Sequence, residues 1–329
     1  MPKAIIMAGG PGERFWPLTH KKFPKYRIRL DNRESLLQKT YQRLLRVYPQ
    51  RDVYVVTTRE HARLIKSELP KLKKQNLIVE PMRRNTAAAI YLSCRTLGES
   101  FGAREVVSFF PADHLIRNEA LFRKTLAQAI SLARQKELLV TVGVKPTFAA
   151  TGYGYLEMGP PVSARLSAYK VKRFAEKPDR RKASQYLKSG RFLWNGGIFT
   201  WKIGTFMEAM KKTAPEFGKR SYAKLPKISI DYALLEKAGN LAVIRTQMDW
   251  CDMGSWDMFH EKALRDKHHN LVHGICHYDQ TRKSLIVNHG RTPIIALGVT
   301  DLIVVQTQRG TLICKKGFSE EAALLSRRL

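Results

Sequence analysis

The chain has 329 residues, of which 44% are hydrophobic, and its formal net charge is +30. These values exclude an intrinsically disordered chain and leave room for one large core with a smaller domain beside it. No apolar run has the length of a membrane-spanning helix, the basic N-terminus lacks the apolar stretch of a signal peptide, and the four cysteines lack zinc-site spacing, so we expect a cytoplasmic protein with reduced thiols.

Apolar runs alternate with amphipathic stretches up to about residue 265. Strands are predicted at 3–8, 52–57, 76–80, 105–111, 138–144, 170–178 and 194–202, with helices at 35–48, 61–72, 85–100, near 204–214 and near 231–239. In the first helix Leu37, Tyr41 and Leu44 share one face, and Ser35 can cap its N-terminus. This βαβα order predicts an α/β fold with a mainly parallel, Rossmann-like sheet, whose ligands bind beyond the carboxyl ends of the strands.

The pattern changes after about residue 265 to short strands with no helices between them. They are predicted at 284–290, 292–299, 301–307 and 310–316, a spacing that suits a small β-solenoid or sandwich. We therefore expect two domains, residues 1–265 and 270–329. So small a β unit gains from packing on the main domain or on a second copy, and we also expect a homodimer.

The first strand runs into Gly9, Gly10 and Gly12, an arrangement that often meets phosphate. A dinucleotide fingerprint is excluded because Phe15 stands where its third glycine belongs, and a Walker loop is excluded because no Gly-Lys-Ser/Thr follows. The glycines can still let backbone N–H groups approach an anion, with Arg14 adding a fork of donors. The bulky Phe15, Trp16 and Pro17 are expected to pack and hold this loop in place. The alternative is an ordinary turn at the end of a strand.

Two carboxylates suit a cation site: Asp113 directly follows an apolar strand, and Asp252 stands in a turn flanked by Trp250 and Trp256. An unpaired carboxylate after a buried strand is costly unless it meets a cation, so the two could together hold Mg²⁺ against phosphates. A helix cap or a turn is the alternative for each of them.

Glu80 and Asn85 precede an alanine-rich helix. A carboxylate and an amide can read the adjacent N–H donors of a guanine edge, although Asn85 could equally be an ordinary N-cap.

Five residues of three later segments suit a sugar phosphate. They are Gly152, Glu176, Lys177, Asn195 and Gly196. The glycines admit a sugar ring close to the backbone, Glu176 and Asn195 can bind hydroxyl groups, and Lys177 can meet a phosphate. Each residue alone could belong to a turn.

The motifs AGGPGERFWPL, FPK, EPMRRNTAAAI, PADH, GYGYLE, EKP, WNGGIF and WCDMGSW follow one another in the order found in a known family. The chain resembles the mannose-1-phosphate guanylyltransferases, which make GDP-mannose, from residue 4 to about 265. Its strand-rich tail resembles the β-helix-like end of that family. The chain leaves no room for the isomerase domain of the longer members, so a short form is expected.

The resemblance implies a role for each matching residue. Arg14, Lys25 and Lys177 are the catalytic cations; Ala8, Gly9, Gly10, Gly12, Glu80, Pro81, Asn85 and Asp113 bind the nucleotide; Gly152, Glu176, Asn195 and Gly196 bind mannose; Asp113 and Asp252 hold Mg²⁺ or another divalent cation. One departure is Tyr26, which follows Lys25 where the family usually has glutamine. We expect GTP and mannose 1-phosphate as substrates and a single in-line displacement at the α-phosphorus.

Three alternative functions are also consistent with the sequence. One is a sugar-1-phosphate nucleotidylyltransferase with another base or sugar, and one is a regulatory subunit that binds GDP-mannose without turnover. The third is a nucleic-acid binder, suggested by the charge of +30. The basic residues are spread along the chain and no recognition motif accompanies them, so we expect no specific nucleic-acid site and no membrane partner.

Overall fold

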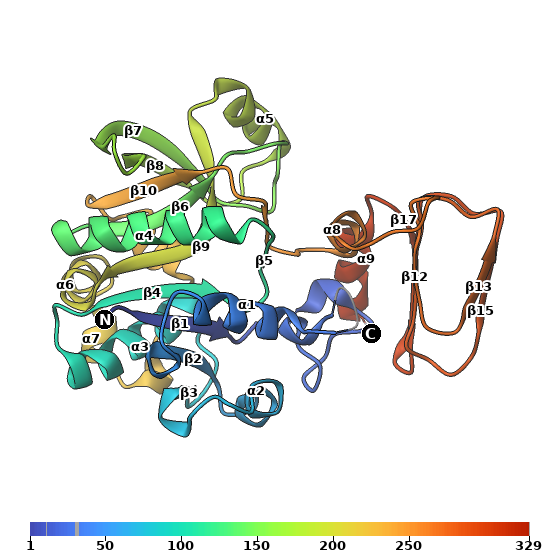
Figure 1. The fold of residues 1–329 in the computed structure, drawn as a ribbon, viewed down its shortest axis with the longest axis horizontal. Coiled ribbons are helices and arrows are strands. Elements are labelled where there is room, and N and C mark those ends of the chain that lie inside the picture. The colour runs from blue at the N-terminus through green and yellow to red at the C-terminus, as the bar shows by residue number, and fades with distance from the viewer. Residues whose placement is uncertain (11, 30–32, 329) are drawn as a thin grey trace. The chain divides into compact units, whose positions relative to one another are not determined.

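The computed structural model describes residues 1–10, 12–29 and 33–328 (Figure 1). The chain divides into two compact units, and neither is continuous in sequence. The first unit is Met1–Gly9 with Thr40–Trp250, and the second is Gly10–Lys39 with Cys251–Leu329. The segment that follows the first strand therefore belongs with the C-terminal part of the chain.

A nine-stranded sheet organises the first unit. In spatial order its strands are β3 (Leu77–Glu80), β2 (Val53–Thr58), β1 (Lys3–Ala8), β4 (Val106–Pro111), β9 (Phe192–Lys202), β6 (Leu139–Val144), β10 (Leu241–Thr246), β8 (Ala168–Ala175) and β7 (Tyr155–Ser163). The pairs within β3-β2-β1-β4 are parallel, as is β6 with β10. The pairs of β9 with β4, β6 and β7, and of β8 with β10 and β7, are antiparallel.

The sheet is thus mixed, and the prediction of a mainly parallel sheet is correct only for part of it. Strand β2, which is parallel to both of its neighbours, is buried along its whole length, whereas β8, which is antiparallel to both of its neighbours, has exposed positions at Lys170, Lys172 and Arg173. Both patterns are typical of their pairing class. The apolar run of β9 looks like a parallel strand in sequence because hydrophobicity does not encode strand direction.

Helices accompany the strands of this sheet (Figure 1). They are α1 (Leu36–Leu45), α2 (Ala62–Glu68), α3 (Asn85–Phe101), α4 (Glu119–Gln135), α5 (Arg180–Ser189), α6 (Ile203–Thr213) and α7 (Glu216–Lys219). The α1 helix begins as predicted: the Ser35 hydroxyl accepts from the backbone N–H of Gln38 at 3.2 Å, and the Gln38 side chain accepts from that of Ser35 at 2.9 Å. These two bonds form a capping box. The helix predicted near 231–239 is a short π-helix, Asp231–Leu235 (η6).

Core clusters lie on both faces of the sheet. One contains Val107 and Val243 with side chains of α3 and α6. The other contains the neighbouring residues Val106 and Ala242 with side chains of α4. Because successive residues of a strand point to opposite faces, helices cover the sheet on both sides.

The second unit holds the short strands of the tail. β12 (Leu271–His273), β14 (Leu285–Asn288), β16 (Leu302–Thr307) and β17 (Gly310–Lys315) form one sheet, and β13 (Cys276–Asp279) and β15 (Ile294–Leu297) form another. Successive strands from β12 to β16 alternate between the two sheets, and the pairs within each are parallel until β17 reverses. Two α-helices of this unit, α8 (Trp256–Lys262) and α9 (Ser319–Leu325), are not predicted from the sequence.

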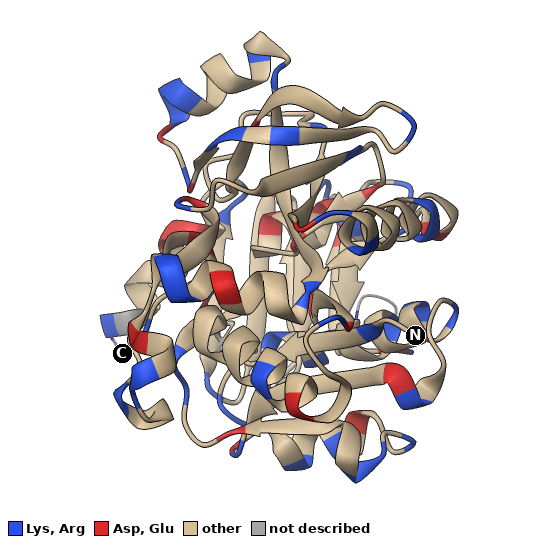
Figure 2. Cartoon of the chain, turned by 90° about the vertical axis from the view of Figure 1, so that its left-hand side faces the viewer, with Lys and Arg blue, Asp and Glu red and all other residues tan. Residues whose placement is uncertain are grey.

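Charge is distributed widely over the protein. Figure 2 shows Lys and Arg on helices, strands and loops rather than along one element. Within the described ranges, no helix is both long enough and apolar enough to cross a bilayer.

Candidate active site

The loop after β1 is shaped by Gly12. This glycine has a φ of +70° and stands just before the 3-10 turn Glu13–Phe15 (η1). A Cβ at this position would lie 2.7 Å from the Cβ of Lys25 and 3.1 Å from its backbone nitrogen. Glycine is needed here because the Lys25 segment approaches closely, and Lys25 is one of the predicted catalytic cations. Whether the loop amides bind phosphate remains a prediction.

The bulky residues after Arg14 fix this loop, as the sequence predicts. Phe15 is completely buried and packs edge-on against Trp256, with ring centroids 4.9 Å apart. The indole N–H of Trp256 donates to the carbonyl of Trp16 at 3.0 Å. The glycine loop is therefore attached to the start of α8, which directly follows the Asp252 turn.

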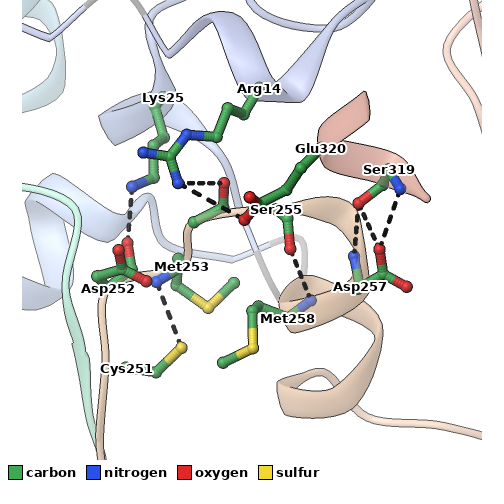
Figure 3. Close-up of polar contacts among 11 residues, drawn as sticks. Arg14, Lys25, Cys251, Asp252, Met253, Ser255, Asp257, Met258, Ser319 and Glu320 are labelled. Carbon is green, nitrogen blue, oxygen red and sulfur yellow. Dashed lines mark hydrogen bonds and ion pairs between the residues drawn. The ribbon is translucent and has the colours of Figure 1, made fainter. Parts of the chain in front are cut away.

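Arg14 and Lys25 both bind that turn (Figure 3). The Lys25 Nζ donates to the main-chain carbonyl of Asp252 at 2.6 Å, and an Nη1 of Arg14 lies 3.5 Å from the carbonyl of Gly254. A Cβ at Gly254 would lie 3.1 Å from both Arg14 Nη1 and Asp252 Oδ1. Arg14 and Lys25 thus meet around a turn that lies more than two hundred positions further along the chain.

Glu320 is a fourth charged residue at this place, and the sequence reasoning missed it. Its carboxylate lies 3.7 Å from Arg14 Nη1, in a pair that is about half exposed on each side. The helix that carries it, α9, is anchored by Asp257, whose carboxylate accepts from the Gly317 N–H at 2.7 Å and the Ser319 hydroxyl at 2.5 Å. The run Ser319-Glu320-Glu321, two positions after Gly317, is a helix-start signal that could have revealed it.

Glu80 lies at the carboxyl end of β3 in the first unit, only 5% exposed. In the register of the sheet it pairs with Thr58 of β2, and Thr57 of β2 pairs with Ala8 of β1, so these residues share one edge. One carboxylate oxygen accepts from the Tyr222 hydroxyl at 2.5 Å, and the other lies 3.8 Å from where a Cβ of Gly9 would stand. Burial raises the pKa of Glu80.

Asn85 is not the N-cap that the alternative reading offered. The cap of α3 is Arg84, and its side chain makes no capping bond. Asn85 itself has a φ of +69°, and its side-chain oxygen accepts from the backbone N–H of the next residue, Thr86, at 2.8 Å. A left-handed conformation favours asparagine because its short amide can bond locally. The side chains of Pro81 and Asn85 are exposed.

Asn195, a predicted sugar ligand, has its amide orientation fixed by three bonds. Its oxygen accepts from the Thr141 hydroxyl at 3.1 Å and from the backbone of Gly197 at 3.3 Å, and its nitrogen donates to Asp231 at 3.1 Å. A Cβ at Gly154 would lie 2.6 Å from a Glu176 carboxylate oxygen and 3.4 Å from the Asn195 Cβ. Glu176, Asn195 and Asp231 therefore form one polar group, which we call the carboxylate cluster.

The remaining predicted sugar-site residues, Lys177, Gly196 and Gly152, have different local surroundings. Lys177 has a φ of +44°, and its Nζ lies 2.6 Å from the Glu176 carboxylate. Gly196 is explained by strand packing, since a Cβ there would lie 2.9 Å from the Val142 carbonyl. A Cβ at Gly152 would meet nothing within 4 Å in the described chain.

Asp231 is a member of the carboxylate cluster that the sequence reasoning missed. Burial raises the pKa of its carboxyl to about 6, and the negative charge of Glu176 adds to the shift. It begins the π-helix η6, and such helices recur at functional sites. The signal in the sequence is the polar residue after the apolar Ile230 of SIDYALL.

Asp113 follows β4 in the first unit, whereas Asp252 belongs to the second. Asp113 is half-buried, between the buried Ala112 and His114, whose Nδ1 accepts from the Trp250 indole at 3.1 Å. No group of three or more His, Cys, Asp or Glu suited to a metal occurs among the described residues. Two carboxylates with phosphate oxygens nevertheless fit the donor preference of a hard divalent cation. The metal pair stays a prediction.

Comparison with known proteins gives a consistent result. The chain matches the nucleotidyl transferase family over residues 3–269. It is 32% identical to a mannose-1-phosphate guanylyltransferase of Escherichia coli, over 96% of this chain and 71% of that protein. It is 30% identical to one of Sinorhizobium fredii, over 100% of this chain and 68% of the relative. A crystal structure from Thermus thermophilus, described as a mannose-1-phosphate geranyltransferase, has a TM-score of 0.88 at 30% identity, covering 99% of this chain and 98% of its own.

Proposed function

The chain belongs to the nucleotidyl transferase family and, within it, to the mannose-1-phosphate guanylyltransferases, and from this premise we propose its reaction in detail. It transfers GMP from GTP to α-D-mannose 1-phosphate, which gives GDP-mannose and pyrophosphate. A phosphate oxygen of the sugar phosphate attacks the α-phosphorus of GTP, and the bond from that phosphorus to the bridging oxygen of pyrophosphate breaks. The observation that carries the proposal is the 32% identity over 96% of the chain.

Catalysis in this proposal depends on positive charge, because two anions must approach each other. Arg14 and Lys25 bind the triphosphate, and Lys177 binds the phosphate of the sugar. The contacts of Arg14 and Lys25 with the 252–254 turn support this role, since they hold both cations in place before substrate arrives. The Gly9, Gly10 and Gly12 amides add donors to the same phosphates.

Asp113 and Asp252 would hold a divalent cation such as Mg²⁺. The cation would supply charge neutralisation at the α-phosphate and the leaving pyrophosphate. The sugar ring would lie against Gly152 and Gly196, with its hydroxyl groups bound by Glu176 and Asn195.

The base is read, in this proposal, at the edge formed by Ala8, Glu80, Pro81 and Asn85. Loss of a buried hydrogen-bonded pair costs about 1–3 kcal/mol, so we expect GTP to be preferred over ATP, UTP and dTTP by at least roughly tenfold in kcat/KM. Purified protein assayed with each nucleotide, mannose 1-phosphate and Mg²⁺ measures this preference. Equal rates with UTP would favour the reading as another nucleotidylyltransferase, and GDP-mannose binding without turnover would favour the regulatory subunit.

The proposal also assigns catalysis and assembly to different parts of the chain. Residues 1–265 carry the chemistry, and residues 270–329 form a β-helix-like domain that serves assembly. The alternation of strands β12 to β16 between two sheets supports this reading. The cytoplasmic location and the lack of a specific nucleic-acid partner stay predictions.

The assembly is proposed to be a homodimer formed through the tail. On β15 the side chains of Ile295 and Leu297 are 80% and 65% exposed, on either side of the buried Ala296. Exposed apolar side chains on one face of a sheet favour burial against a partner. Light scattering should therefore give about 75 kDa, twice the 37.7 kDa of one chain. A mass of one chain at micromolar concentration would contradict the dimer.

A further inference from the structure

Tyr222 contacts Glu80 but has no role in the reaction described above. It begins the 3-10 turn Tyr222–Lys224 (η5) after α7, and its ring is partly buried. Its hydroxyl lies 2.5 Å from Oε1 of Glu80, a residue 142 positions away. A hydrogen bond from a tyrosine to a buried carboxylate is short and charge-assisted, so it constrains the direction of the carboxylate.

The position of Tyr222 is fixed by the contacts of its own segment. The Arg84 guanidinium donates to the carbonyl of Ala223. The backbone N–H of Ile230 donates to the Thr86 hydroxyl at 2.9 Å, and that of Ala87 to the Ile228 carbonyl at 3.3 Å. The segment 222–230 is therefore tied to the start of α3, immediately after the Glu80 loop.

The bond leaves the two oxygens of Glu80 in different surroundings. Oε1 accepts from Tyr222 with one of its two lone pairs, and Oε2 faces Gly9 at the carboxyl edge of the sheet, 3.8 Å from where a Cβ of that glycine would stand. Guanine presents a ring N–H and an exocyclic NH₂ side by side, and a carboxylate can accept from both only in one plane. A carboxylate free to rotate would lose this alignment part of the time.

We propose that Tyr222 is a positioning residue for base selection, whose hydroxyl sets the plane in which Glu80 accepts from guanine. This inference rests on the proposed function, in which Glu80 reads the base. Tyr222 itself does not touch the nucleotide.

The same contact acts on the protonation of Glu80. Burial raises the pKa of this carboxyl, whereas the hydrogen bond from Tyr222 and the positive charge of Arg83 act to lower it. The positive charge of Arg84 acts to lower the pKa of the Tyr222 hydroxyl. A protonated carboxyl accepts poorly from guanine, so GTP binding weakens as the pH falls through the pKa of Glu80. Removal of the hydroxyl raises that pKa further and moves the weakening to higher pH.

The test is Tyr222→Phe, which removes one oxygen atom. We expect KM for GTP to rise about tenfold with kcat nearly unchanged, because the lost bond to a charged group acts on binding. The preference for GTP over ITP, which lacks the exocyclic amine, should narrow, and the acid limb of kcat/KM for GTP should move to higher pH. The matched control is Tyr278→Phe, which removes a hydroxyl 3.0 Å from Asp266 in the tail and should change none of these values.

A Glu80→Gln background separates positioning from a general effect on the fold. There is then no carboxylate to orient or protonate, so Tyr222→Phe should add less than about twofold to the KM change of Glu80→Gln alone. Full additivity, or an unchanged KM and pH profile in Tyr222→Phe, would overturn the inference. Failure of the proposed function would instead appear in the unmodified protein, as absence of any preference for GTP.

Discussion

Replacement of Asp252 by asparagine is expected to lower kcat by about a hundredfold or more while the fold stays intact. The substitution keeps the size of the side chain and removes its charge. Lys25 binds the main-chain carbonyl of Asp252 at 2.6 Å, so this contact survives the change. Asp113→Asn should behave in the same way if both carboxylates hold the cation. Turnover should also stop in a chelator and return with Mg²⁺.

Asp257→Asn provides a matched control for these variants. Asp257 lies five positions further on, and its carboxylate accepts from the Gly317 N–H and the Ser319 hydroxyl. Its replacement should lower the melting temperature more than Asp252→Asn does and lower turnover less. If Asp252→Asn melted early yet kept near-normal turnover, Asp252 would be a turn residue, and the metal assignment would fall.

The sequence was sufficient wherever the determining contacts are local or strongly patterned. The apolar run before Gly9 is a buried strand, Ser35 caps α1, and Phe15 packs to hold the glycine loop. Each of these features follows from periodicity, capping chemistry or a cluster of bulky side chains. The carboxylate of Glu80 was also placed correctly at a strand end.

The parts that the sequence did not predict depend on contacts between distant segments. Tyr222 meets Glu80, and Glu320 meets Arg14, across 142 and 306 positions, and neither pairing has a local signature. Asp231 sits within a π-helix, which the ordinary helical period does not reveal. The reversed direction of β9 follows from how the chain returns to the sheet, which its apolar pattern does not specify.

Gly12→Ala is the second substitution from which we expect a large loss, of about a hundredfold in kcat/KM. A left-handed φ costs alanine about 1 kcal/mol or more relative to glycine. The larger effect is steric: the new Cβ would lie 2.7 Å from the Cβ of Lys25 and 3.1 Å from its backbone nitrogen. The Lys25 segment must therefore move, and the 2.6 Å bond from its Nζ to the Asp252 carbonyl is lost.

Two further alanine variants separate strain in the protein from blocked access of substrate. At the exposed Gly239 a Cβ would meet nothing within 4 Å, so Gly239→Ala should leave stability and turnover near those of the unmodified protein. The same space exists at Gly10, yet this glycine is predicted to approach the triphosphate. Gly10→Ala should therefore raise KM for GTP with an unchanged melting temperature, whereas Gly12→Ala should lower both stability and turnover. Normal GTP kinetics in Gly10→Ala would remove Gly10 from the phosphate site, and normal kinetics in Gly12→Ala would show that Lys25 does not need its present position.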